Sequence, residues 1–265
     1  MARVLVTGSS DGLGRVSARQ LLALGHEVLL HARSPARAKE ALAAVPGARA
    51  VLVGDLSSVA ETRALAVQAR AAGPLDAVIH NAGVGYRDGR VETVDGLSRL
   101  FAVNVLAPYL LTALAPAPRL VYLSSGMHRG GDPDLSDLQW QRRPWDGSQA
   151  YSDSKLLDVV LAFAVAHRWA GVRSNAVEPG WVPTRMGGPS APDDLEAGGR
   201  TQAWLAVSGD PAAAVTGRCF FHQRQRPAHP AASDPAVQEA LLLACEALTG
   251  VALPSQPGLP GAAGP

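Results

Sequence analysis

The sequence predicts an α/β fold, a single doubly wound parallel sheet of about seven strands with helices on both faces. Three observations favour this class. Short apolar runs alternate with amphipathic stretches at a spacing that suits right-handed strand–helix–strand crossovers. Several apolar runs end in glycine or polar residues, as strands do at the sheet edge where ligands bind. The length of 265 residues suits one domain, placed at residues 1–250, with a Gly/Pro/Ala-rich and loosely packed tail at 251–265.

Composition excludes several classes of protein. A formal net charge of +1 gives no electrostatic case for a nucleic-acid or membrane-surface partner. The opening apolar run is too short for a signal peptide, and there is no run of about 18 apolar residues that would span a membrane, so a cytoplasmic protein is expected. Cys219 and Cys245 stand in no CxxC or His-rich context and are interpreted as core thiols. His222 and His229 lack partners at metal-ligand spacing, and no metal is predicted.

The first strand, turn and helix carry a glycine-rich motif. A buried strand at 4–6 leads into Gly8-Ser-Ser-Asp-Gly-Leu-Gly14, a helix follows at 16–24, and a second strand occupies 27–31. Glycines at such a turn let the backbone approach a pyrophosphate, and the helix N-terminus offers free N–H groups. This order of elements predicts a Rossmann-type dinucleotide site. Its residues in the turn would be Gly8, Ser10, Asp11, Gly12, Leu13 and Gly14.

The residue that follows the second strand indicates which dinucleotide is bound. An acidic residue at this place takes the ribose 2′-hydroxyl of NAD, whereas an arginine suits the 2′-phosphate of NADP. Arg33 therefore favours NADP(H), with Ser34 and Arg37 as further ligands. Asp11 is a contrary sign, because its carboxylate could lie near the phosphate. The alternative is that Arg33 is only an exposed loop residue.

Turn residues and periodicity divide the rest of the chain. Residues 126–148 and 223–233 lack a sustained period and are interpreted as loops, and residues 181–199 are dense in glycine and proline. Helices are expected at 35–45, 59–72, 91–114, 151–170, 201–207 and 235–249, and strands at 50–53, 75–80, 119–125, 172–177 and 218–221.

Tyr151 and Lys155, on an expected helix, would project from one face one turn apart. A phenol has a pKa of about 10, and a neighbouring ammonium favours the phenolate, which makes tyrosine usable as a general acid/base. Alone, the pair also fits a solvated helix face. Ser125 closes a strand at the ligand edge of the sheet, where it would face the nicotinamide end of a cofactor. Asn104 stands in an apolar stripe, where its amide needs a hydrogen-bond partner.

Taken together, these motifs resemble the short-chain dehydrogenase/reductase family, in the family's order and over roughly residues 1–250. The resemblance implies that Tyr151 is the general acid/base and that Lys155 lowers its pKa and binds the nicotinamide ribose. It also implies that Ser125 holds the substrate oxygen and that Asn104 anchors a water linking Lys155 to solvent. The motifs are Thr7-Gly8-xxx-Gly12-x-Gly14, Asn81-Ala82-Gly83, Asn104, Ser124-Ser125, Tyr151-xxx-Lys155 and Pro179-Gly180.

The same resemblance implies the remaining cofactor contacts. Asp55 and Leu56 would border the adenine. The adenosine ribose would lie on Asn81, Ala82 and Gly83, and the carboxamide on Pro179, Gly180, Val182 and Thr184.

One departure from the family pattern is the spacing of 26 positions between Ser125 and Tyr151, about twice that of many members. The intervening segment, with Ser124-Ser125-xx-His128, resembles the retinol dehydrogenase and WW-domain oxidoreductase branch. Members of that branch mostly use NADP(H), in agreement with Arg33. Ser125 is chosen over Ser124 because it holds the second place of the pair.

The segments around the pair would decide the substrate. The loop at 126–148 should border it, and the stretch at 181–199 matches the position of the family's mobile lid. The alternative for Trp140 and Trp145 is that they only pin the loop to the body. The expected wall consists of Met127, Trp140, Trp145, Trp181 and Met186, together with Ser125.

The expected function is NADP(H)-dependent interconversion of a carbonyl and an alcohol by hydride transfer, on a small apolar or aromatic ketone or aldehyde. Two alternatives stay open: a non-catalytic dinucleotide-binding sensor or scaffold, and a carbon–carbon double-bond reductase. By the resemblance, a homodimer or homotetramer would form through the helices at 91–114 and 151–170.

Overall fold

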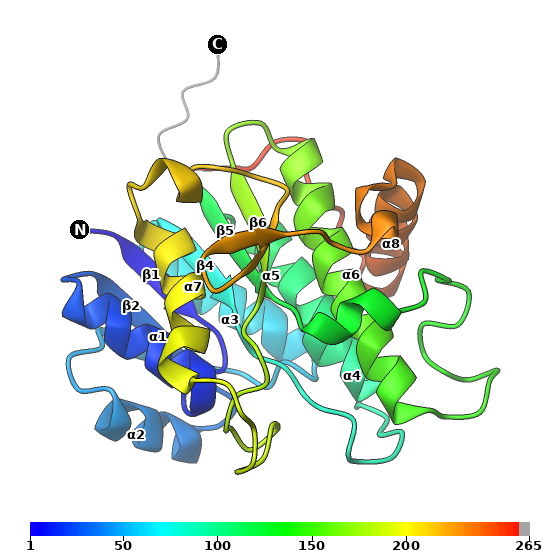
Figure 1. The fold of residues 1–265 in the computed structure, drawn as a ribbon, viewed down its shortest axis with the longest axis horizontal. Coiled ribbons are helices and arrows are strands. Elements are labelled where there is room, and N and C mark those ends of the chain that lie inside the picture. Colours follow the sequence, from blue (N-terminus) through cyan, green and yellow to red (C-terminus); the bar gives the residue numbers. More distant parts are fainter. Residues whose placement is uncertain (260–265) are drawn as a thin grey trace.

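A computed structural model describes residues 1–259 of the chain, and Figure 1 shows its arrangement. The described residues form one sheet in the strand order β3-β2-β1-β4-β5-β6-β7-β8, in which only the β7–β8 pair is antiparallel. The predicted fold class is confirmed, with β8 as a strand beyond the expected set. The strands are β1 (Arg3–Val6), β2 (Glu27–Ala32), β3 (Ala50–Val53), β4 (Ala77–His80), β5 (Arg119–Leu123), β6 (Arg173–Glu178), β7 (Cys219–Phe221) and β8 (Arg224–Arg226).

Helices cover both faces of the sheet because alternate strand residues point to opposite sides. Leu5 lies in the apolar core shared with α3, α5, α6 and α8, and Val4 and Val6 lie in the core shared with α1, α2 and α7. Cys219 and Cys245 are buried free thiols, as expected. The helices are α1 (Gly12–Ala23), α2 (Pro35–Ala44), α3 (Val59–Ala71), α4 (Arg99–Phe101), α5 (Ala107–Leu114), α6 (Gly147–Arg168), α7 (Leu195–Val207) and α8 (Pro235–Thr249).

The expectation of one helix over 91–114 is wrong at its N-terminal end. The helical segment begins at Arg99, and Glu92 bridges to Ser98 before it. Gly96 adopts a positive φ of 73°, which closes a turn that a continuous helix would not allow. Between α4 and α5 the chain forms a π-helical turn, Ala102–Leu106.

The expected helix at 201–207 begins earlier, at Leu195, because Asp194 caps it by accepting a hydrogen bond from the Ala197 amide. Gly198 and Gly199 therefore lie inside α7 and not in the lid. A β-carbon at Gly199 would come within 2.6 Å of Val16 on α1. These glycines allow two helices to pack closely and do not break α7.

The tail differs from expectation at its start. Leu253 is buried, and the Trp169 indole donates to the Pro254 carbonyl, so the start of the tail is packed on the body. Residues 260–265 of the tail lie outside the described residues. The helix α6 is buried along nearly its whole length and packs against α8, seen beside it in Figure 1.

Candidate active site

A cavity of about 1150 Å³ opens at the carboxyl ends of the parallel strands. Of the residues expected in the site, Gly14, Ser34, Asn104, Trp140 and Trp145 are not part of its lining. The others are brought together there: Gly8, Ser10, Asp11, Gly12, Leu13, Arg33, Arg37, Asp55, Leu56, Asn81, Ala82, Gly83, Ser125, Met127, Tyr151, Lys155, Pro179, Gly180, Trp181, Val182, Thr184 and Met186.

The glycine turn has the backbone that its sequence requires. Gly8 and Gly12 adopt positive φ angles of 62° and 51°, which side-chain-bearing residues rarely adopt. Asp11 caps α1 by accepting from the Gly12 amide. Gly14 lies behind the turn, where a β-carbon would come within 2.5 Å of the Asn81 amide nitrogen. It serves packing of the turn and not the cavity wall.

Thr7 and Asn81 fasten this turn to the end of β4. The Thr7 hydroxyl accepts hydrogen bonds from the Asn81 and Ala82 amides, both at 3.0 Å. The Asn81 side chain donates to the Thr7 carbonyl at 2.9 Å. Because its amide is used in this way, Asn81 shapes the cavity, while Ala82 and Gly83 present their backbone to it.

His31 was missed by the sequence reasoning. Its Nδ1 accepts from the Gly8 amide, and its Nε2 lies 2.9 Å from the Gly54 carbonyl, so the ring carries its proton on Nε2. Burial lowers the pKa of His31. A neutral imidazole thus joins β2 to the glycine turn and to the end of β3. The only sequence signal was a histidine at the end of a buried strand.

Arg33 and Arg37 make the cationic end of the cavity. Arg33 is exposed to it, and Arg37 donates to the Ser10 hydroxyl at 3.2 Å. The contrary residue Asp11 pairs with Arg185 at 3.0 Å and with Arg15 at 3.5 Å. Its negative charge is therefore offset by arginines from the lid and from α1.

Tyr151 and Lys155 lie one turn apart on α6, as expected, with the Lys155 ammonium 5.8 Å from the Tyr151 ring centre. Burial raises the pKa of Tyr151, while Lys155 and the Ser125 hydroxyl lower it and Asp158 raises it further. The lysine acts in the expected direction. The net direction is upward, because burial outweighs it.

Asp158 is a second residue that the sequence reasoning missed. The Lys155 ammonium donates to the Asp158 carboxylate and to the Leu123 carbonyl, both at 2.8 Å. Both side chains are buried. Nothing in the sequence distinguished an aspartate one turn past the lysine from an ordinary polar helix residue.

The two serines after β5 have different partners. The Ser124 hydroxyl donates to the Lys155 carbonyl at 2.7 Å and fixes the strand to α6. The Ser125 hydroxyl accepts from the Met127 amide at 3.2 Å, which leaves its proton available to the cavity. This geometry favours Ser125 over Ser124 as the residue that meets a substrate oxygen.

Asn104 lies in the π-helical turn, a form that is frequent at functional sites. Its side-chain oxygen accepts from the Val84 amide at 2.8 Å, and its nitrogen donates to the Val84 carbonyl and the Ser154 hydroxyl. The buried amide is thereby satisfied, as its apolar setting required. A β-carbon at Gly83 would lie 3.4 Å from Asn104 and 3.5 Å from the Lys155 ammonium, so this glycine keeps the space before both groups open.

The tryptophans of the 126–148 loop pack beside the cavity and not in its wall. Trp140 and Trp145 form an edge-to-face pair at 5.6 Å, in a cluster with Leu100, Ala150 and Tyr151. The Arg143 guanidinium stacks on Trp140 at 3.7 Å. They pin the loop to α6.

Met186 and Trp181 belong to the lid and do line the cavity. The Met186 sulfur lies 3.6 Å from the Tyr151 hydroxyl. The Trp181 ring is largely exposed, and its indole N–H donates to the Gly187 carbonyl. The lid thus reaches the phenol that was expected to act on the substrate.

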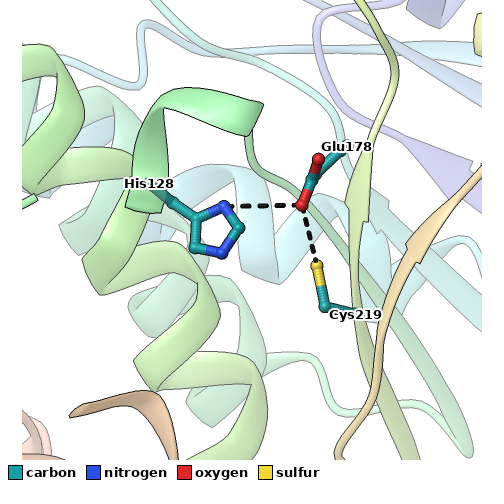
Figure 2. Close-up of side chains that lie close together, drawn as sticks. All are labelled: His128, Glu178 and Cys219. Atoms are coloured by element: carbon teal, nitrogen blue, oxygen red, sulfur yellow. Dashed lines mark hydrogen bonds and ion pairs between the residues drawn. The ribbon is translucent and has the colours of Figure 1, made fainter. Parts of the chain in front are cut away.

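Figure 2 shows a buried cluster of His128, Glu178 and Cys219. The His128 Nδ1 lies 2.7 Å from the Ser125 carbonyl and its Nε2 accepts from the His229 amide, so both ring nitrogens are in use. Arg129 holds both oxygens of Glu178.

Burial raises the pKa of Cys219 to about 12, so its sulfur remains a thiol at neutral pH. These contacts tie the turn after β5 to β6 and β7.

Comparison with known proteins agrees with this geometry. A family model described as short chain dehydrogenase matches residues 2–127. An uncharacterized oxidoreductase of Emericella nidulans is 46% identical over 260 residues, which cover 96% of this chain and 99% of that protein. The short-chain dehydrogenase chyC of Penicillium rubens is 44% identical over 96% of this chain and 100% of its own length. Retinol dehydrogenase 14 of Mus musculus is 31% identical over 94% of this chain and 86% of that protein.

Two solved structures extend the comparison. An uncharacterized protein from Mycobacterium paratuberculosis aligns with a TM-score of 0.82 and 27% identity over 96% of this chain and 95% of that chain. A short chain dehydrogenase from Shigella flexneri complexed with NADP aligns with a TM-score of 0.62 and 25% identity, over 84% and 97%. The chain therefore belongs to the short-chain dehydrogenase family of oxidoreductases, with retinol dehydrogenases among its relatives.

Proposed function

We propose that the protein is an NADP(H)-dependent oxidoreductase that interconverts a carbonyl and an alcohol by hydride transfer. The observation that carries this proposal is the shared cavity of the glycine turn and three reactive side chains, Ser125, Tyr151 and Lys155. The residues present fit a dinucleotide, because Gly8 and Gly12 bring no side chain to the cavity and the N-terminus of α1 faces the same space. The glycine turn at one end of this cavity can hold phosphates, and the side chains at the other end can transfer a proton.

NADP(H) is proposed over NAD(H) on two grounds. Arg33 and Arg37 supply two guanidinium groups to the cavity lining, and Arg37 contacts the hydroxyl of Ser10 in the turn. Guanidinium groups bind phosphate through charge-assisted hydrogen bonds. The Shigella flexneri relative was solved as its NADP complex.

When bound, NADPH would supply a hydride to the carbonyl carbon. Tyr151 would give the proton on its phenol oxygen to the carbonyl oxygen, and Ser125 would hold that oxygen by donating a hydrogen bond. Lys155 has three N–H donors, of which Asp158 and Leu123 take two, so one remains for the cofactor ribose beside Gly83. The hydride and the proton together convert the carbonyl into the alcohol, and oxidation is the reverse.

The proposed substrate is an apolar or aromatic ketone or aldehyde. Met127, Trp181 and Met186 line the cavity near the reactive groups, and apolar walls with few polar groups are typical of small-molecule sites. Because the Met186 sulfur contacts the Tyr151 hydroxyl, a substrate oxygen has to replace it there. We propose that the lid moves to admit the substrate and that the protein acts in the cytoplasm.

Replacement of Tyr151 by Phe tests this function. We expect Tyr151→Phe to bind NADPH with unchanged affinity and to lose about 100-fold or more in turnover, because only the proton donor is removed. NADPH oxidation over a panel of ketones, aldehydes and quinones measures turnover, and fluorescence titration measures NADPH affinity.

Tyr86→Phe is the matched control, since the Tyr86 ring lies 5.3 Å from that of Tyr151 and loses the same hydroxyl. Full activity of Tyr151→Phe would contradict the mechanism. Tight NADPH binding by the wild type without turnover on any carbonyl would favour the non-catalytic sensor instead.

A further inference from the structure

We propose that Asp158 is a positioning residue that holds the Lys155 ammonium and keeps Tyr151 in its phenol form, so that the site is set for carbonyl reduction. This inference rests on the proposed function, because it assigns a direction to the reaction at the same site. The contact that carries it is the buried ion pair between Lys155 and Asp158, at 2.8 Å.

The ion pair fixes where the ammonium lies. Asp158 is on α6, one turn beyond Lys155, and Leu123 closes β5 on the opposite side. The two bonds hold the ammonium in place, and its last N–H remains for the opening at Gly83, where an added β-carbon would lie 3.5 Å from the lysine nitrogen. Asp158 is itself shielded from solvent, so the lysine is the cation that compensates its charge.

The ion pair also fixes the net charge around Tyr151. With Asp158 ionised, Lys155 and Asp158 together are neutral, and loss of the Tyr151 proton leaves one uncompensated negative charge in a buried site. Without that carboxylate, the same loss would leave a neutral tyrosinate–ammonium pair. Since a like charge nearby disfavours ionisation, Asp158 makes the phenol hold its proton to higher pH.

Other ionisable groups around α6 do not supply the negative charge that Asp158 places near Tyr151. Tyr122 on β5 faces Asp158 and bonds to the Thr112 hydroxyl, and Tyr86 faces Tyr151 from the segment after β4. Two charged pairs on neighbouring elements are each neutral overall. Arg129 binds Glu178 between the turn after β5 and β6, and Arg168 binds Glu239 between α6 and α8.

The consequence is a preference in direction at neutral pH. Reduction needs a tyrosine that can donate a proton, whereas oxidation needs a tyrosinate that can accept one. A phenol that keeps its proton well above neutral pH serves reduction, and oxidation is confined to alkaline pH.

The test is a pH titration of the full-length protein with ¹³Cζ-labelled tyrosine, followed by NMR. The chain has 4 tyrosines, and the signal missing in Tyr151→Phe identifies Tyr151. We expect Asp158→Asn to lower the Tyr151 titration midpoint by roughly one pH unit or more. Asp153→Asn is the matched control, since Asp153 is another buried α6 carboxylate but pairs with Arg143 at 2.9 Å; its midpoint should equal that of the wild type. An unchanged midpoint in folded Asp158→Asn would overturn the proposal.

A second measurement, on the same Tyr151 NMR signal, needs only the wild-type protein. Burial raises the pKa of Asp158, so the wild-type Tyr151 signal should also shift as the carboxyl takes up its proton in acid. Absence of any such shift down to the pH at which the protein unfolds would overturn the proposal even if Asp158→Asn did not fold. Neither NMR measurement uses substrate or NADPH. A negative NMR result would therefore not contradict the proposed function, and an absence of turnover would not affect the NMR result.

Discussion

Arg33 is the single residue that most directly tests the choice of cofactor. Its guanidinium is exposed to the cavity beside Arg37. We expect Arg33→Asp to weaken NADPH binding by about 100-fold relative to NADH, because a charge-assisted hydrogen bond is replaced by repulsion of the 2′-phosphate. Titration of both dinucleotides measures the ratio. Lys39→Asp makes the same charge change outside the cavity lining and should leave the ratio unaltered; equal ratios in both variants would remove Arg33 from the site.

Individual residues differ in how far the sequence revealed them. Tyr151, Lys155 and Arg33 could be predicted because each belongs to a local pattern or follows a recognisable strand. His31 and Asp158 could not, since their importance comes from partners on other segments, the Gly8 amide and the buried Lys155 ammonium. The same holds for Trp140, whose type suited a cavity wall but whose contacts place it against α6.

The contact between α1 and α7 depends on glycine in α7. A β-carbon at Gly199 would come within 2.6 Å of Val16. We therefore expect Gly199→Val to lower the free energy of unfolding by about 1–3 kcal/mol, through overpacking between two helices. Urea denaturation measures this change. Gly209→Ala is the control, because no atom lies within 4 Å of the added carbon; a loss of stability as large as that of Gly199→Val would show that packing is not the cause.

Helices were predicted well where periodicity and caps agreed, as for α8, which the sequence placed at its observed residues 235–249. Helices were predicted poorly at glycines, because glycine can either close a turn or lie inside a helix that packs closely against a neighbour. At Gly96 it closes a turn that precedes the helical segment, whereas at Gly198 and Gly199 it lies inside α7 because a neighbouring helix comes close. Glycine in a sequence does not reveal which neighbour it will meet.

The stability of the whole molecule should depend on pH through a buried histidine. His80, at the end of β4, stacks on Tyr122 at 4.6 Å, and burial lowers its pKa to about 3. The unfolded chain takes up this proton near pH 6.5 and the folded chain does not, so stability present above pH 6.5 is lost as the pH falls toward 3. The loss amounts to about 5 kcal/mol at most.

Denaturant unfolding of the wild type and His80→Phe between pH 8 and pH 3 measures this effect. Phe keeps a ring on Tyr122 but binds no proton, so the stability of the variant should fall less steeply with acid. Burial also lowers the pKa of His31 and His128, which adds to the slope in both proteins. Parallel slopes would contradict the assignment of this proton to His80.

The fold class could be predicted because alternating strands and helices leave few arrangements for a parallel sheet. The covering of α6 by α8 could not, because the sequence does not show which apolar faces meet.

Transfer of deuterium from [4-²H]NADPH to a carbonyl substrate tests the central claim most directly. We expect the wild type to yield an alcohol with deuterium on the carbinol carbon, and Tyr151→Phe to bind the cofactor but yield at most about one hundredth of that product. Deuterium on the β-carbon of a product whose carbonyl is intact, or equal product from Tyr151→Phe, would contradict it.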